Sequence, residues 1–544
     1  MSKFAIPLLA VFNLLFVFRR FLFTQDANTD LLNYHSYVPY SLLHNKWNLD
    51  FHPAGIQTYL TPYQDIFLYP ILHTFPGYLG TLLLYLIHLS LCVPLALLTK
   101  TLLPELSKVN RKWFALFSAC GAMFMSQLGL SMGDILPSIV AAWGLVILFK
   151  ALEDKIQPNH WLLITSGILF GLAVGLKFTM GYVFVGIFAI TILLVFQTKA
   201  WTYLFLPLSM ILTLVITYLP WGLHLYRLYG SPFFPFWNAW FGSSHFPEIN
   251  YDETKLGMSE LPHLLTLPFW QLWGISRFSP YPFDNWFSQV QTSEARFLDL
   301  RWVFIFALAS YWLLKNGQRF LGSFKLSLSS NVQISFVFWF SSHLAWAILF
   351  GIQRYEILLE SMALLLIFIL LSKLGVGFNK SGLFTSTGLS ILLVISLSTI
   401  PMDFGRTRIG ASPIVPQTSL GFLKEFDTVV LQSGAMSYLA SVDPQLENVT
   451  WVGPPFDTIA NRSRLRNILL SSRNIGYVYY RNQSGNVRAS IRNIGIKSIE
   501  NCKSFSPPLD QVIPPVNRVS RFPGGMVYCN AVVIDKVIVN SSAK

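Results

Sequence analysis

The chain has 544 residues, of which 53% are hydrophobic and only 12% are charged, and its mean hydropathy is +0.50. Soluble globular proteins carry about 25% charged residues, so this composition excludes an ordinary soluble domain and indicates a membrane protein. The net charge of +13 is spread along the chain, which fits loops at a lipid surface better than a nucleic-acid-binding patch.

Apolar runs of membrane-spanning length predict about eleven transmembrane helices, and hence a mainly α, polytopic membrane protein. We expect these helices near residues 4–23, 77–99, 113–129, 134–150, 161–176, 179–197, 202–221, 301–316, 333–351, 355–373 and 383–400. The first run has no small-residue cleavage site before Arg19 and Arg20, so we expect a retained helix rather than a cleaved signal peptide.

The lysine and arginine residues predict the orientation. If the N-terminus is cytoplasmic, the inside loops contain most of these residues, whereas the short outside connections near 130, 177 and 353 contain only Lys177 and Arg354. An excess of positive charge in cytoplasmic loops is the usual arrangement. Eleven spans then place the C-terminus outside, in the periplasm if the membrane is a bacterial inner membrane.

Two long loops are expected on the outer side, at residues 24–75 and 222–300. In the first, residues 34–43 and 63–72 are expected to form amphipathic segments along the membrane interface. The predicted spans, the last of which ends near residue 400, and these two loops make up a membrane part that covers residues 1–401.

Residues 402–544 lack long apolar runs and are predicted to form a small extracytoplasmic α/β domain. Short β-rich stretches are expected at 428–432, 449–452, 475–480 and 527–534, with a helix-like segment at 459–472. Cys502 and Cys529 both fall in this tail. They can form a disulfide in an oxidising compartment, although their spacing does not establish the geometry.

Ionisable residues gather where the first apolar run ends, and such residues are costly at a membrane unless they have a role. Asp26 and Asp30 are four residues apart and would face the same way on a helix, where two carboxylates favour a shared proton or a cation. Either can act as a general base toward a hydroxyl, and Asp26 can instead cap a helix. His35 can position a substrate or phosphate, or simply form an interfacial hydrogen bond.

Further candidates lie at other outer connections. Asp134 can bind a divalent cation, orient an acceptor, or be the N-cap of the fourth span. Lys177 and Arg354 are expected to be unpaired cations that contact phosphate, either of a ligand or of ordinary lipids. Glu356 and Glu360 are four residues apart, and Glu360 can balance Arg354, contact a substrate or be the partner of a buried cation.

The motif Asp30-Leu-Leu-Asn-Tyr-His35 resembles the Asp-x-Leu-x-Tyr-His signature in the first outer loop of GT-C superfamily glycosyltransferases. These multi-spanning enzymes transfer a sugar from a polyprenyl-phosphate carrier. The number of spans, the two long outer loops, the outer C-terminal domain and Gly175-Leu-Lys-Phe-Thr179 are also similar. The resemblance implies that Asp30 is the catalytic base and that a lipid, glycan or protein is the acceptor.

The chain departs from the family pattern at one point, because many members have two adjacent acids where this chain has the single Asp30. Whether the reaction uses a metal ion therefore stays open. A divalent cation, if present, would use Asp30 and Asp134. A lipid-phosphate donor would place its phosphate against Lys177 and Arg354, and a single displacement would invert the anomeric centre. The aromatic second loop can stack on sugars, with His245, Glu248 and Asp252 as polar candidates.

Two other classes of protein remain as alternatives. A transporter or lipid flippase should show internal repeats and ionisable groups near mid-membrane, whereas here the charges cluster at the ends of spans. A glycan ligase or polymerase of another fold usually centres on an arginine-rich outer loop, whereas the 24–75 loop is acidic and aromatic. The sequence contains no His-Glu-x-x-His, Cys-x-x-Cys, Walker or Gly-x-Gly-x-x-Gly motif.

Overall fold

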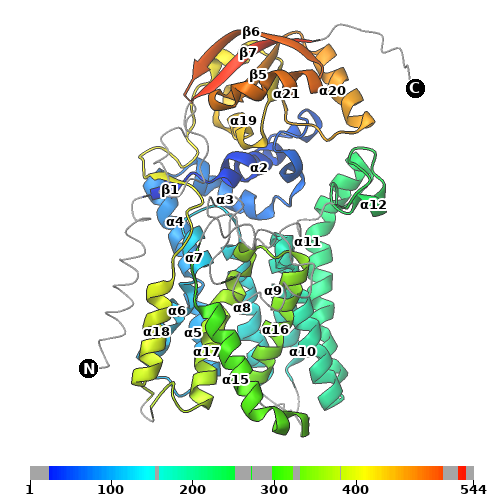
Figure 1. The fold of residues 1–544 in the computed structure, drawn as a ribbon. Helices are drawn as coiled ribbons and strands as arrows, with labels where there is room; N and C mark the ends of the chain where they lie inside the picture. Colours follow the sequence, from blue (N-terminus) through cyan, green and yellow to red (C-terminus); the bar gives the residue numbers. More distant parts are fainter. Residues whose placement is uncertain are drawn as a thin grey trace.

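The computed structural model describes residues 24–153, 158–250, 271, 297–322, 331–379, 382–506 and 525–533. In this part of the chain a bundle of helices lies at one end, a β-sheet lies at the other, and short helices of the 24–75 segment lie between them (Figure 1). The span expected at 4–23 lies outside the described residues.

The bundle is built from helices that pack side by side. These are α4 (Gly77–Leu89), α5 (Cys92–Leu102), α6 (Lys108–Ala119), α7 (Ala122–Gln127), α8 (Ile135–Ala151), α9 (His160–Leu176), α10 (Tyr182–Thr198), α11 (Phe205–Tyr229), α15 (Arg301–Gly322), α16 (Asn331–Leu349), α17 (Ile357–Lys373) and α18 (Ser386–Ser398). α17 is apolar on all sides except for a few residues such as Glu360, and it is buried from Ile357 to Leu371, which identifies it as the central helix.

Five helical stretches of the described chain are long and apolar enough to cross a membrane, so the protein is mainly helical and the stretches indicate a multi-pass membrane protein. They are Gly77–Leu102, Phe178–Thr198, Trp201–Tyr229, Asn331–Leu349 and Gln353–Lys373. The shorter apolar helices α8, α9 and α18 also coincide with expected spans. The total of eleven spans stays a prediction.

The span expected at 113–129 is instead two helices, α6 and α7, with a break between them. The first N–H groups of a helix have no partner within that helix. Here the buried carboxylate of Glu360 supplies two partners, accepting hydrogen bonds from the N–H groups of Met123 at 2.9 Å and Phe124 at 3.2 Å. A buried acid therefore stabilises the break in an otherwise apolar run.

Arg301 secures the other side of the same break. Its guanidinium donates to the carbonyl of Cys120 at 2.9 Å and to the carbonyl of Glu360 at 3.0 Å, and it pairs with Asp299 at 3.0 Å. Glu360 thus belongs to a structural cluster with Arg301 and Asp299. The expectation that Glu360 balances Arg354 is wrong, because Arg354 pairs with another acid.

The C-terminal region forms a five-stranded mixed sheet in the order β4-β3-β5-β7-β6. Its elements are β3 (Thr428–Leu431), β4 (Thr450–Val452), α20 (Ile459–Ser471), β5 (Ile475–Tyr480), α21 (Val487–Asn493), β6 (Ile496–Phe505) and β7 (Met526–Val533). β3, β4 and β5 are parallel, whereas β7 runs antiparallel to β5 and β6. A disulfide between Cys502 and Cys529 joins β6 to β7, which is consistent with an extracytoplasmic location.

The 24–75 segment packs with this sheet region in one hydrophobic core. It contains β1 (Thr24–Asp26), the π-helical turn η1 (Leu31–His35), α2 (Ser36–Leu43), η2 (Lys46–Asn48), η3 (Gly55–Tyr59) and α3 (Tyr63–His73). β1 pairs antiparallel with β2 (Arg406–Arg408), and Phe51 bridges to Val452 at the edge of β4. The serine hydroxyl of Ser437, after β3, donates to the carbonyl of Asn33 in η1. The sheet region therefore holds the segment that contains Asp30 and His35.

Acidification is expected to weaken this junction, because two histidines are buried there without charge. Burial lowers the pKa of His52 to about 3 and that of His73 to about 3. Between pH 6.5 and 3 these histidines bind protons in the unfolded chain but not in the folded protein. The free energy of unfolding therefore falls as the pH falls. At pH 5 each histidine costs about 2 kcal/mol, and Asp50, whose pKa burial raises to about 6, offsets about 1 kcal/mol.

The measurement is the thermal unfolding midpoint of the purified protein at pH 7 and pH 5, compared with that of His52→Asn. Asparagine tolerates the left-handed backbone at this position, where φ is 54°, and it does not titrate. The variant should lose less stability than the wild type between the two pH values. An equal loss in both proteins would contradict the role assigned to His52.

Candidate functional site

A cavity of about 120 Å³ lies where the 24–75 segment meets the end of the helical bundle. It is lined by four stretches of chain, with Asp30, Tyr34, His35, Gln57, Tyr59, Leu60, Thr61, Gln64, Asp65, Leu176, Lys177, Phe178, Thr179, Tyr218, Phe236, Arg354 and Tyr355 as the lining residues. The cavity is small beside typical ligand sites of about 300–1,000 Å³, so it suits a reacting group such as a phosphate.

Asp30 and Arg354 form an ion pair on the cavity wall. The Arg354 Nη1 lies 2.9 Å from Asp30 Oδ2, and both side chains are largely buried, with 11% and 21% exposed, respectively. Burial raises the pKa of the Asp30 carboxyl, but the charge of Arg354, aided by that of Lys177, outweighs it, and the net pKa lies below the ordinary value. Asp30 is therefore a carboxylate at neutral pH.

Lys177 and Asp134 form a second ion pair beside the first. The Lys177 Nζ lies 2.5 Å from Asp134 Oδ1 and donates to the carbonyl of Met132 at 2.8 Å. The Tyr355 ring contacts both cations, with Lys177 Nζ at 5.8 Å and Arg354 Cζ at 5.2 Å from its centre. The expectation that Lys177 and Arg354 are unpaired is wrong, although both do line one cavity with Asp30.

The local sequence explains how these side chains reach the cavity. Lys177 follows the last residue of α9 in an extended conformation, and Arg354 lies in a single turn just before α17. Asp134 is at the N-cap position of α8, as expected, but its side chain makes no capping hydrogen bond. Gly133 has φ +84°, a left-handed backbone conformation that favours glycine in this turn.

His35 and Asp65 form a buried pair that the sequence did not indicate. The His35 Nδ1 lies 2.6 Å from Asp65 Oδ1, and only 2% and 5% of the two side chains are exposed. The other ring nitrogen, Nε2, has no hydrogen-bond partner among the described residues, although His35 lines the cavity. Asp65 therefore orients an imidazole that has one nitrogen available to a ligand.

Asp26 does not share a helical face with Asp30, because it lies in β1 rather than in a helix. It is fully buried, and it accepts hydrogen bonds from the Ser131 N–H at 2.6 Å and from the Asn28 side chain at 2.7 Å. It does not line the cavity. The contacts make Asp26 a structural acceptor that ties β1 to the turn before α8.

Asp26→Asn is expected to destabilise the protein by about 1–3 kcal/mol, because an amide N–H₂ would face a backbone or side-chain N–H in a buried site. Chemical unfolding of the purified variant measures this loss. Asp26→Asn protein that is as stable as the wild type would contradict the structural role.

The remaining candidates lie away from the cavity. Glu356 pairs with His343, with Nδ1 and Oε1 2.6 Å apart, inside the bundle. His245 contacts Asn461 of α20 at 3.2 Å, and neither it nor Glu248 lines the cavity. Asp252 lies outside the described residues.

The two acids expected to hold a divalent cation do not fit one. Asp30 and Asp134 each already pair with a side-chain cation of the protein, Arg354 and Lys177. In the described ranges, no three His, Cys, Asp or Glu side chains are grouped as metal ligands would be. Asp30 and Asp134 therefore do not support a role for a metal ion in this cavity.

No family model matches this chain, and neither the curated proteins nor the solved structures contain a match to it.

Proposed function

We propose that this protein is a membrane glycosyltransferase that transfers a sugar from a polyprenyl-phosphate donor to a lipid, glycan or protein acceptor. The observation that carries the proposal is that a carboxylate, Asp30, and two cations, Lys177 and Arg354, line one small cavity at the end of the bundle. A base and an anion-binding pair are what such a transfer requires.

The reaction is a single displacement at the anomeric carbon. The acceptor hydroxyl forms the new bond to this carbon while the bond from the carbon to the phosphate oxygen breaks. The hydroxyl proton passes to Asp30, and the polyprenyl phosphate leaves with the bonding electrons. Lys177 and Arg354 stabilise its charge, and the configuration of the anomeric carbon inverts.

Donor binding also activates the base in this proposal. In the free protein, Arg354 lowers the pKa of Asp30 and so weakens it as a base. A phosphate that bonds to Arg354 shares its charge, which makes Asp30 more basic only when the donor is present. The free Nε2 of His35 can then hold the acceptor or a phosphate oxygen.

The proposed orientation places the cavity and the C-terminal sheet outside, at the periplasmic face of an inner membrane with a cytoplasmic N-terminus. The disulfide between Cys502 and Cys529 supports this side for the sheet. The alternative functions are a lipid or glycan flippase and a glycan ligase or polymerase.

The test is a transfer assay in nanodiscs with a panel of polyprenyl-phosphate sugars and a membrane extract as the source of acceptors. We expect one donor to be consumed, with release of polyprenyl phosphate and a product of inverted configuration. Movement of intact donor across the bilayer without cleavage would indicate a flippase, and a product that carries the whole lipid-linked glycan would indicate a ligase. Failure of every donor to bind or react would refute the proposal.

A further inference from the structure

A second cavity, of about 990 Å³, lies in the C-terminal sheet region and has no part in the proposed transfer step. It is bounded by the residues that follow β3 and β4, by α20 and by α21. Its volume is at the upper end of the range of small-molecule sites, about 300–1,000 Å³.

The cavity lies between α20 and α21 and extends across the sheet. Gln432 and Gly453 follow β3 and β4, at the carboxyl ends of these parallel strands. Gly495 and Val533 lie at the opposite edge, because Val533 pairs with Ile496 at the start of β6. Residues from both edges of the sheet therefore line this cavity.

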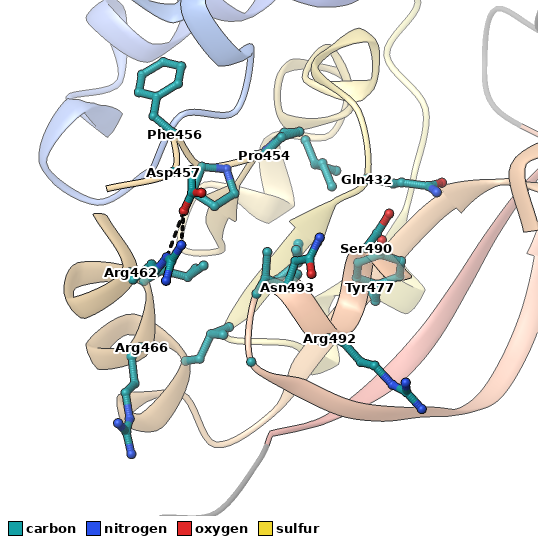
Figure 2. A pocket seen from close by; sticks show the side chains of 18 of the residues that line it. Gln432, Pro454, Phe456, Asp457, Arg462, Arg466, Tyr477, Ser490, Arg492 and Asn493 are labelled. Carbon is teal, nitrogen blue, oxygen red and sulfur yellow. Dashed lines mark hydrogen bonds and ion pairs between the residues drawn. The ribbon is translucent and has the colours of Figure 1, made fainter. Parts of the chain in front are cut away.

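Positive side chains lie at the rim of this cavity. Arg466 on α20 and Arg492 at the end of α21 lie on opposite sides of the view in Figure 2, with Asn493 between them, and both extend outward. Arg462 also lines the cavity and pairs with Asp457, the one acid among the lining residues. The lining thus has three arginines against one aspartate, and Arg466 and Arg492 are both exposed.

The other lining groups indicate what kind of anion fits. Gln432, Ser490 and Asn493 can exchange hydrogen bonds with hydroxyl groups, while Leu465 and Leu469 offer an apolar surface. Arginine forks bind carboxylates and phosphates through two parallel hydrogen bonds. A molecule with hydroxyl groups, an apolar ring face and an acidic group meets all three requirements.

A side chain connects this cavity with the proposed active site. Phe456 lines the larger cavity, and its ring centre is 6.3 Å from that of Tyr59, which lines the smaller one. We propose that the larger cavity binds a saccharide carrying a carboxylate or a phosphate, held by Arg466 and Arg492, and that this saccharide is part of the acceptor. Its assignment to the acceptor rests on the proposed transfer, whereas the binding itself does not.

The test is calorimetry of the full-length protein in nanodiscs with four probes: tetragalacturonic acid, glucose 6-phosphate, neutral maltotetraose and inorganic phosphate. We expect at least one of the acidic saccharides to bind at least 10-fold more tightly than both the neutral saccharide and inorganic phosphate. Which of the two binds distinguishes a carboxylate from a phosphate ligand.

Arg466→Ala combined with Arg492→Ala should weaken the binding about 10-fold or more. Arg488→Ala is the matched control, because Arg488 is an exposed arginine of α21 that does not line the cavity, and it should bind as the wild type does. Asp30→Asn should also bind normally. If the wild-type protein binds an acidic saccharide but transfers no sugar from any donor, the transferase is refuted and this site is kept.

Several results would overturn the assignment. These are no binding of either acidic saccharide, equal binding of the neutral one, inorganic phosphate bound as tightly as the acidic saccharides, or a double variant that binds as Arg488→Ala does.

Discussion

Asp30→Asn is expected to reduce sugar transfer by about 100-fold or more, because the substitution keeps the shape of the side chain but removes its ability to accept the acceptor's proton. The loss should appear in turnover, with donor affinity retained, since Arg354 stays in place. The measurement is the initial rate of transfer with the donor identified in the nanodisc assay.

Stability has to be measured with this variant, because asparagine leaves Arg354 without its carboxylate partner. Asp30→Glu restores the charge and should regain both stability and part of the turnover. Asp403→Asn is the control, because Asp403 is a partly buried acid outside the cavity. Turnover by Asp30→Asn within a few-fold of the wild type would remove Asp30 from the mechanism.

The pH dependence gives an independent check on the same residue. The pKa of Asp30 lies below its ordinary value, so its ion pair adds stability above the unfolded pKa, near 4, and loses it as the pH falls through the folded pKa. In the free protein, Asp30 therefore stays ionised from pH 5 to pH 8. A loss of kcat/KM within that interval, which reports the free protein, must come from another group.

The elements of the C-terminal sheet were largely predictable from local sequence. β3, β4, β5 and β7 are runs of β-branched and aromatic residues, and each coincides with an expected strand within one residue. β6 was missed, because it is the polar edge strand Ile496–Phe505, mostly exposed, whose composition does not differ from that of a loop. Propensity identifies strands whose residues are mostly buried, including β4 at the other edge, and fails where most residues are exposed.

The members of the candidate site were predictable, but their partners were not. Lys177, Arg354 and Asp30 stand out because each is a charge at the end of an apolar run, which is a local feature of the sequence. The pairing of Arg354 with Asp30 crosses 324 residues, and no local pattern reports it. The local sequence around Asp65 did not indicate a functional role, because that role depends on its contact with His35 from a neighbouring helical segment.

The error over Asp26 has the same origin. A spacing of four residues places two side chains together only if the segment is helical. Residues 24–26 instead form a strand, because they pair with residues 406–408, which follow the membrane part almost 400 positions later in the chain. Pairing with a distant strand determines the conformation of residues 24–26, so the spacing of four residues does not place Asp26 beside Asp30.

Arg354→Ala is expected to weaken use of the polyprenyl-phosphate donor by about 2–4 kcal/mol, the usual effect of losing a desolvated, charge-assisted contact to an anion. Arg354→Lys should show a smaller defect, because the charge remains while the planar fork is lost. The measurement is a titration of donor in nanodiscs, with the half-saturation concentration and turnover determined for each variant. The half-saturation concentration for the acceptor should change far less.

The ion pairs of the cavity determine how the second cation has to be tested. Lys177→Ala alone would leave Asp134 as an uncompensated buried acid, and its effect on folding would obscure its effect on the donor. Lys177→Met combined with Asp134→Asn removes the pair as a unit and should still weaken donor use. Arg227→Ala, an exposed arginine at the end of α11, should leave donor use unchanged. If the Arg354 variants and this double variant all use the donor as Arg227→Ala does, the two cations do not bind its phosphate, and Lys177 and Arg354 serve only to hold Asp134 and Asp30 in the fold.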